Sequence, residues 1–150
     1  MNEPADGGQL IPGSRNRMRV AIVDDEPAIC RSLLRLLTVA GLDARAYSSG
    51  REFLEAWQAH RPDCIVLDVQ MAGLNGFDVF ARLRQDGGLM PVIMIPANDD
   101  PNLRLRAKAL GIDVFLLKPI DGESLLRDIT QLVARWRSNA MDEQLSDPRT

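Results

Sequence analysis

The chain has 150 residues, which suits one domain better than two. Its 18 basic and 21 acidic side chains give a net charge of −3, which argues against bulk electrostatic binding to nucleic acid. The longest apolar runs are too short to span a membrane, and the N-terminus lacks the apolar segment of a secretory signal. Cys30 and Cys64 lack metal-type spacing. We therefore expect a cytoplasmic protein with no direct contact to nucleic acid or membrane.

Short apolar runs alternate with amphipathic stretches along the chain, and this alternation predicts five strand–helix pairs. A loose N-terminal tail over residues 1–17 precedes them, and a C-terminal tail or linker over residues 138–150 follows. The domain itself is expected over residues 18–137. The predicted strands cover residues 20–23, 42–47, 63–68, 90–95 and 113–117, and the predicted helices cover 27–40, 49–61, 77–85, 101–110 and 121–137.

Proline, glycine and serine mark the expected helix ends. Pro27 and Pro101 stand at helix starts, where proline is favoured, and Gly41 and Gly111 stand just past helix ends. Ser49 and Glu52 have capping-box spacing. These signals support the helix assignments independently of the apolar pattern.

The predicted strands are mostly continuous apolar runs, as in Ile65–Leu67, rather than alternating ones. Continuous runs are typical of strands covered on both faces by helices. Five consecutive strand–helix pairs therefore predict an α/β fold with a doubly wound parallel sheet.

Acidic side chains follow two of the predicted strands, and a lysine follows a third. Asp24 and Asp25 come after the first strand, Asp68 ends the third, and Lys118 follows the fifth. In open parallel sheets ligands bind beyond the carboxyl ends of the strands, so these four side chains are expected to converge. A helix N-cap would account for one of the acids but not for three. Clustered carboxylates repel without a cation, and oxygen ligands suit Mg²⁺.

Three segments give the chain a specific resemblance. VDDE at Val23–Glu26, LDVQMAGLNG at Leu67–Gly76 and FLLKP at Phe115–Pro119 resemble, in order and spacing, the receiver domains of bacterial two-component response regulators. The resemblance covers roughly residues 18–137. It implies a flavodoxin-like (βα)5 fold with strand order 2-1-3-4-5.

The resemblance also implies roles for the acidic positions. Asp68 matches the phosphoacceptor, and it joins Asp24 and Asp25 as a ligand or near-ligand of Mg²⁺, for which Mn²⁺ could substitute. Gln70 matches the position whose backbone carbonyl completes the metal site. The implied donor of the phosphoryl group is a histidine kinase or a histidine phosphotransfer protein. The resemblance implies that the protein is not an enzyme acting on an external substrate, although it assists its own phosphorylation and dephosphorylation.

Further positions match the phosphate-binding and switch elements of the family. Lys118 matches the phosphate-pairing lysine, which a cis peptide bond to Pro119 orients, and Ala97 matches the residue whose backbone N–H contacts the phosphoryl group. Gln70 and Asn98 match two variable positions that tune hydrolysis of the aspartyl phosphate. Phe115 matches the aromatic switch, although an ordinary core position explains it equally well.

Two residues depart from the family pattern. Pro96 stands where the family carries Thr or Ser. In the family the hydroxyl of this residue binds the phosphoryl group, and its movement toward that group opens space for the aromatic switch residue to turn inward. Proline has neither a hydroxyl nor an N–H. Ala72 replaces a usual proline in the loop after the phosphoacceptor. We therefore expect phosphorylation to persist but its readout to be weak or to take another route.

Two alternatives remain open. The first is a phosphate-independent pseudo-receiver that acts as a protein-interaction module, which Pro96 favours and the intact acids disfavour. The second is a phosphatase of the haloacid dehalogenase type, but Gln70 stands where that class has a second aspartate. The face formed by the fourth helix, fifth strand and fifth helix is expected to hold a homodimer or an output partner. The chain could be a stand-alone receiver or one domain of a longer protein.

Overall fold

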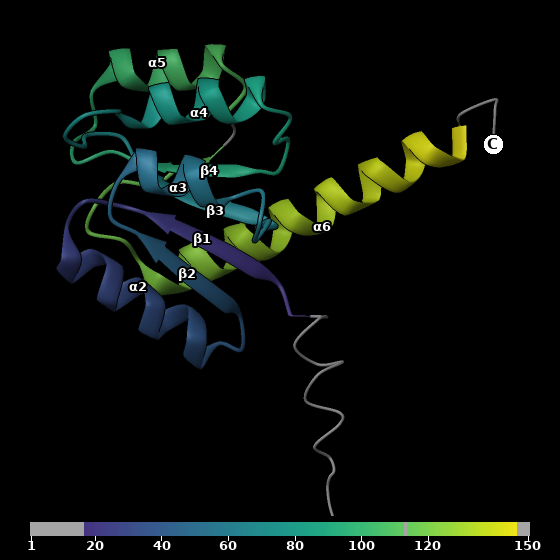
Figure 1. The fold of residues 1–150 in the computed structure, drawn as a ribbon, viewed down its shortest axis with the longest axis horizontal. Helices are drawn as coiled ribbons and strands as arrows, with labels where there is room; N and C mark the ends of the chain where they lie inside the picture. The colour runs from purple at the N-terminus through teal and green to yellow at the C-terminus, as the bar shows by residue number, and fades with distance from the viewer. Residues whose placement is uncertain (1–16, 113, 147–150) are drawn as a thin grey trace, which may run out of the picture.

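Five parallel strands form one sheet in the order β2-β1-β3-β4-β5 (Figure 1), as predicted. The structure is a computed structural model that describes residues 17–112 and 114–146. The strands are β1 Arg19–Val23, β2 Asp43–Tyr47, β3 Cys64–Asp68, β4 Val92–Ile95 and β5 Val114–Phe115. The helices are α2 Pro27–Val39, α3 Gly50–Ala56, α4 Gly76–Gln85, α5 Pro101–Ala109 and α6 Gly122–Ser146. The doubly wound α/β fold class is confirmed.

Helices cover both faces of the sheet, with α3, α4 and α5 on one side and α2 and α6 on the other (Figure 1). Alternate residues of each central strand enter the two cores, so that in β3 Ile65 and Leu67 pack with α3 and α4, while Cys64 and Val66 pack with α2 and α6. All five residues of β3 are buried. Burial on both faces explains why this strand reads as an unbroken apolar run.

Side-chain caps fix the starts of the helices that flank the site. Ser49 Oγ accepts a hydrogen bond from the Glu52 N–H at 3.1 Å, which is one half of the predicted capping box, while Glu52 Oε1 accepts from the Ser48 N–H rather than from Ser49. The Asn75 side chain and Asp78 form a reciprocal capping box at the start of α4. Such caps satisfy backbone donors that the first turn leaves unpaired. They therefore also fix the loops that enter these helices.

The fifth strand is shorter than predicted, because only Val114 and Phe115 pair as a regular strand. It lies at the sheet edge and pairs with β4 alone. Hydrogen bonds nevertheless continue past it, since the Leu116 N–H donates to Met94 O at 2.9 Å and the Lys118 N–H to Pro96 O at 3.2 Å. The backbone therefore still delivers Lys118 to the carboxyl edge of the sheet.

The last helix is longer than predicted. We expected it to end near Arg137, but α6 continues to Ser146 and projects beyond the sheet (Figure 1). The added segment contains Ala140 and Met141, which favour helix, and the next proline in the sequence is Pro148. Arg137 Nη2 also forms an ion pair with Asp63 Oδ1 at 3.2 Å, which ties the helix to the start of β3. Helix propensity therefore extends α6 into the segment that we expected to be a C-terminal tail or linker.

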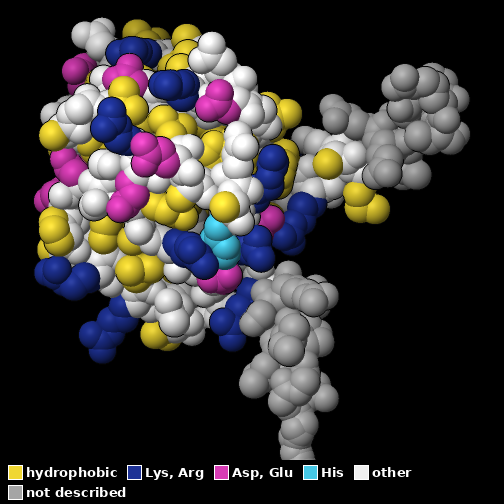
Figure 2. Space-filling view, viewed as in Figure 1, with side chains coloured by type: hydrophobic (Ala, Val, Ile, Leu, Met, Phe, Trp, Pro, Cys, Tyr) yellow, Lys and Arg dark blue, Asp and Glu magenta, His cyan; other side chains and the backbone are white. Residues whose placement is uncertain are grey.

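The face shown in Figure 2 carries basic and acidic side chains intermingled, with the single histidine among them. His60 Nε2 lies 3.9 Å from Asp43 Oδ2. Residues 1–16 of the predicted N-terminal tail lie outside the described residues. Among the helices described, none combines the length and apolar character needed to cross a lipid bilayer.

Candidate functional site

Three carboxylates meet where the first and third strands end. Asp24 follows β1 and is 1% exposed, while Asp68 is the last residue of β3 and is 2% exposed. Asp25 is exposed beside them. Each residue offers an oxygen, and these oxygens all lie within 4.8 Å of one another. The structure therefore brings together the three acids that the sequence placed at one edge of the sheet.

Lys118 reaches this cluster from the end of the fifth strand. Its Nζ lies 2.8 Å from Glu26 Oε1, 3.1 Å from Asp24 Oδ2 and 3.4 Å from Asp68 Oδ1. The Lys118–Pro119 peptide bond is cis, as the resemblance implied. Burial alone would lower the pKa of Lys118, but the close contacts with Glu26 and Asp24 and the charges of Asp24 and Asp68 raise it above its ordinary value. The ammonium group therefore stays charged across the neutral range.

The carboxylates still lack full compensation. Asp24 Oδ2 and Asp68 Oδ1 are buried, and no described donor aligns with either to form a hydrogen bond, so their contacts with Lys118 are ion pairs. Burial and the charges of Asp24 and Asp25 outweigh the opposing effect of Lys118 and together raise the pKa of Asp68 to about 6. Buried acidic oxygens without donors are costly unless a cation or proton lies nearby. The three carboxylates therefore form a set of oxygen ligands that fits a hard divalent ion such as Mg²⁺.

Side chains also tie together the loops around the cluster. Within the loop after β1, the Glu26 N–H donates to Asp24 Oδ1 at 2.9 Å. The Ala72 N–H, in the loop after β3, donates to Asp25 Oδ2 at 3.1 Å. Gln70, also in the loop after β3, contacts the loop after β4, because its Oε1 accepts a hydrogen bond from the Ala97 N–H at 3.2 Å. The loop after β3 is thereby linked to the loops after β1 and β4.

The two positions linked to switching lie just after β4 and in β5, neighbouring strands in which Phe115 pairs with Met94. Pro96 is buried directly after β4, and Phe115 is half-buried in β5. The Arg104 guanidinium covers the Phe115 ring at 5.3 Å and binds Asp99 Oδ1 through Nη2 at 2.7 Å. The ring is thus held from outside by α5.

Asn98 lies exposed in the loop after β4, and its neighbour Ala97 is also exposed.

Glu26 is the site residue that sequence reasoning missed. It belongs to the VDDE segment, yet no role was assigned to it. Its carboxylate makes the shortest of the three contacts of the Lys118 ammonium, at 2.8 Å. Its position directly after Asp24 and Asp25 was the available signal. What could not be inferred is that the side chain, 60% exposed, turns back toward a lysine 92 residues away.

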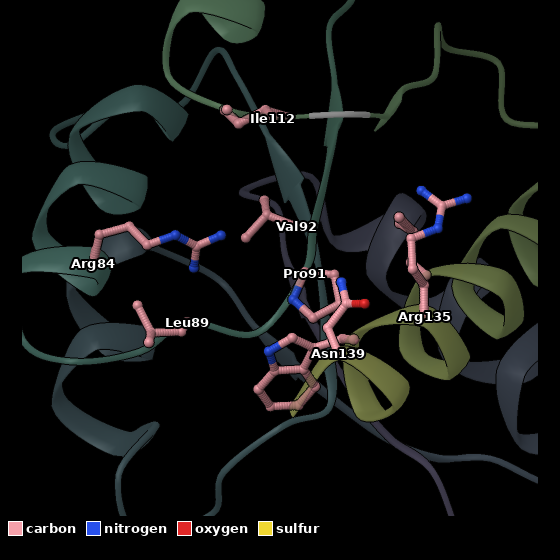
Figure 3. A pocket seen from close by; sticks show the side chains of 10 residues that line it. Arg84, Leu89, Pro91, Val92, Ile112, Arg135 and Asn139 are labelled. Carbon is pink, nitrogen blue, oxygen red and sulfur yellow. The ribbon is translucent and has the colours of Figure 1, made fainter. Parts of the chain in front are cut away.

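A hollow of about 170 Å³ lies at the opposite edge of the sheet (Figure 3). Pro91 and Val92 line it at the start of β4, and Ile112 lines it before β5. Figure 3 shows the Arg84 side chain extending into it from α4. Because this hollow lies at the amino ends of the strands, it is separate from the carboxylate cluster.

A doubly wound sheet with an acidic cluster and a lysine at its carboxyl edge defines the class of receiver domains. The sequence pattern of the response regulator receiver domain matches residues 20–130, and the chain belongs to this family.

Curated relatives include the response regulator MprA of Mycolicibacterium vanbaalenii, 36% identical over 118 residues, which cover 79% of this chain and 51% of that protein. MprA of Mycobacterium leprae is 35% identical over 129 residues, covering 86% and 57%. The chain thus spans about half the length of the curated relatives it matches.

Solved structures support the same assignment. The chemotaxis protein CheY4 of Vibrio cholerae superposes with a TM-score of 0.73 at 29% identity, covering 77% of this chain and 98% of that one. A response regulator receiver protein of Burkholderia phymatum superposes with a TM-score of 0.70 at 40% identity, covering 79% and 96%. The chain therefore shares the fold and family of two-component receiver domains.

Proposed function

We propose that the chain is a phosphoacceptor that takes a phosphoryl group on Asp68 in two-component signalling. The observation that carries this proposal is the buried Asp68 carboxylate, which faces Lys118 and lies beside Asp24 and Asp25. A histidine kinase or histidine phosphotransfer protein in the cytoplasm supplies the group. Exposed leucines on α5 and in the segments that follow α5 and β5 offer a surface for a second copy or an output partner, with Leu105 66%, Leu110 41% and Leu117 37% exposed.

The chemistry follows from the positions of these groups. A carboxylate oxygen of Asp68 attacks the phosphorus of a phosphohistidine, the P–N bond breaks, and the imidazole nitrogen keeps the electron pair and takes a proton. Lys118 Nζ pairs with a phosphoryl oxygen as a point charge. Hydrolysis reverses the modification, because water attacks phosphorus and the Asp68 carboxylate leaves with the electrons of the P–O bond.

Asp24, Asp25, Asp68 and the backbone carbonyl of Gln70 are the groups that would hold Mg²⁺. When bound, the ion supplies positive charge that keeps Asp68 ionised and screens the incoming phosphoryl oxygens. Burial raises the pKa of Asp68 to about 6, so without a cation part of the population is protonated in mildly acidic solution.

Incubation with Mg²⁺ and acetyl phosphate should add one phosphoryl group to the protein, as measured by intact mass. Asp68→Ala should show no gain, because the nucleophilic carboxylate is gone, and omission of Mg²⁺ should reduce the gain strongly. Asp128→Ala, on α6 away from the site, is the matched control and should be modified like the wild type. A gain that survives Asp68→Ala would show that another residue is the acceptor.

We further propose that Pro96 weakens the coupling between phosphorylation and Phe115. Pro96 has no hydroxyl to bind the phosphoryl group. The Pro96 carbonyl accepts a hydrogen bond from the Lys118 backbone N–H. Arg104 of α5 covers the Phe115 ring, so the ring is held on the side that faces α5. The loss of one hydrogen bond to a charged group, about 1.5–3 kcal/mol, is comparable to a typical coupling free energy of about 1–3 kcal/mol.

Pro96→Thr should therefore strengthen this coupling. In NMR spectra of the Mg²⁺ and beryllofluoride complex, the Phe115 ring signals of the wild type should move little from their positions in the unphosphorylated protein. Those of Pro96→Thr should move more, because a hydroxyl becomes available to the phosphoryl analogue. Large and equal movement in both proteins would show that Pro96 does not limit switching.

The phosphate-independent interaction module is the second candidate, and Pro96 is the observation that favours it. It predicts no phosphoryl gain under any condition while Mg²⁺ binding remains measurable. The mass experiment described above therefore separates the two functions.

A further inference from the structure

Both groups proposed to contact phosphoryl oxygens already have acceptors from this chain. The Ala97 N–H donates to Gln70 Oε1 at 3.2 Å, and Lys118 Nζ donates to Glu26 Oε1 at 2.8 Å. The acceptors come from different loops, after β3 and after β1. In each case a side-chain oxygen already occupies a donor that the proposed phosphoryl contact would use.

The contact of Gln70 is the more consequential of the two, because Pro96 contributes neither an N–H nor a hydroxyl. At the end of β4 the Ala97 N–H is thus the first backbone donor after the strand. A backbone N–H makes one strong hydrogen bond, so Gln70 Oε1 and a phosphoryl oxygen compete directly for it.

Glu26 competes for Lys118 in a similar way. The ammonium group has three donors, and three carboxylates surround it at 2.8, 3.1 and 3.4 Å. Asp24 and Asp68 are the buried acids proposed to face the metal, whereas Glu26 is 60% exposed. Glu26 is therefore the partner that can leave Lys118 at low cost, because water can solvate its carboxylate.

We propose that Gln70 and Glu26 are resting-state caps, meaning side chains that occupy the phosphate-facing donors until a phosphoryl group displaces them. This role rests on the proposed function of Asp68. It is distinct from tuning hydrolysis, because it acts on entry of the phosphoryl group and on the unphosphorylated protein. The caps keep Ala97 and Lys118 in place, and they make phosphorylation compete against two intramolecular contacts.

Removing a cap should therefore tighten binding of a phosphoryl analogue. With Mg²⁺ present, Gln70→Leu should lower the Kd for beryllofluoride about 3- to 10-fold, the range expected for releasing one hydrogen bond. Glu26→Ala should lower it about 2- to 5-fold, because exposed ion pairs are weak. The double variant should combine both effects, since the caps act on separate donors.

Three comparisons distinguish a cap from a residue that only supports the fold. Gln85→Leu, at the exposed end of α4, is the matched control and should leave the Kd unchanged. Gln70→Glu keeps an acceptor oxygen and should bind beryllofluoride no more tightly than the wild type. In the unphosphorylated protein, hydrogen exchange of the Ala97 amide should be several-fold faster in Gln70→Leu than in Gln85→Leu.

The outcomes separate this inference from the proposed function. Unchanged or weaker analogue binding in both Gln70→Leu and Glu26→Ala, with the wild type still phosphorylated on Asp68, would overturn the caps alone. An Ala97 amide that exchanges equally fast in Gln70→Leu and Gln85→Leu would also overturn the role of Gln70. Absence of analogue binding and of phosphorylation in every variant would overturn the proposed function and the caps together.

Discussion

Asp68→Asn should raise the free energy of unfolding of the metal-free protein at pH 7 by about 1–3 kcal/mol. Burial and the neighbouring charge of Asp24 raise the pKa of Asp68 to about 6, which means that the folded state disfavours the ionised carboxylate. Asparagine keeps the shape and removes the charge. Lys118 loses one of its contacts but keeps Asp24 and Glu26.

The pH dependence of this effect has a defined sign. The ordinary pKa of an aspartate, 3.8, applies to Asp68 in the unfolded chain, and burial raises the pKa to about 6 in the folded protein. Between these values the folded state binds more protons, so the contribution of Asp68 to the free energy of unfolding falls as pH rises and is constant above about pH 6 to 7. The stability advantage of Asp68→Asn over the wild type should therefore grow between about pH 4 and 6 and then level off.

Urea denaturation over this pH range, without divalent ions, measures the effect. Asp128→Asn, on α6, is the matched control and should not show this growth. Added Mg²⁺ should stabilise the wild type more than Asp68→Asn, because an ion that binds the folded state favours it and the variant has lost a ligand. An Asp68→Asn protein less stable than the wild type at pH 7 without metal would show that its carboxylate is already well compensated.

Strand order and the acidic edge were predictable for different reasons. The alternating strands and helices indicated a parallel sheet, but the order β2-β1-β3-β4-β5 came from the resemblance rather than from periodicity. Asp24, Asp68 and Lys118 could be placed together because each stands at or just after the end of a strand, and parallel strands end at one edge. Spacing along the chain was sufficient for these residues.

The contacts of longer side chains were not predictable in this way. Glu26 and Gln70 lie in loops, and they contact Lys118 and Ala97. These contacts depend on side-chain rotamers, which the sequence pattern does not encode. The predicted end of the last helix was wrong for a different reason: residues 138–150 were assigned to a tail or linker, although Ala140 and Met141 favour helix. Sequence reasoning thus placed the site residues along the chain, but it missed Glu26 and the side-chain contact of Gln70.

Gly76→Ala should lower the free energy of unfolding by about 3 kcal/mol and weaken Mg²⁺ binding several-fold. Gly76 opens α4 and lies against the backbone at the end of β3. A Cβ at this position would overlap the Asp68 carbonyl oxygen and lie 2.9 Å from Val69 Cα. Backbone atoms of a central strand cannot move aside as a flexible side chain can, so the loop after β3 must shift.

That shift would reach the site, because the same loop carries Gln70 and Ala72, which contact Ala97 and Asp25. Gly122→Ala is the matched control. The three atoms nearest to its Cβ would all belong to the flexible Leu36 side chain, the first at 3.2 Å, and the expected change in the free energy of unfolding is less than about 1 kcal/mol. Chemical denaturation and calorimetric Mg²⁺ titration of both variants test the prediction. Equal stability and equal Mg²⁺ affinity in the two would show that the end of β3 has room to adapt, and that the position of Asp68 does not depend on a glycine at the start of α4.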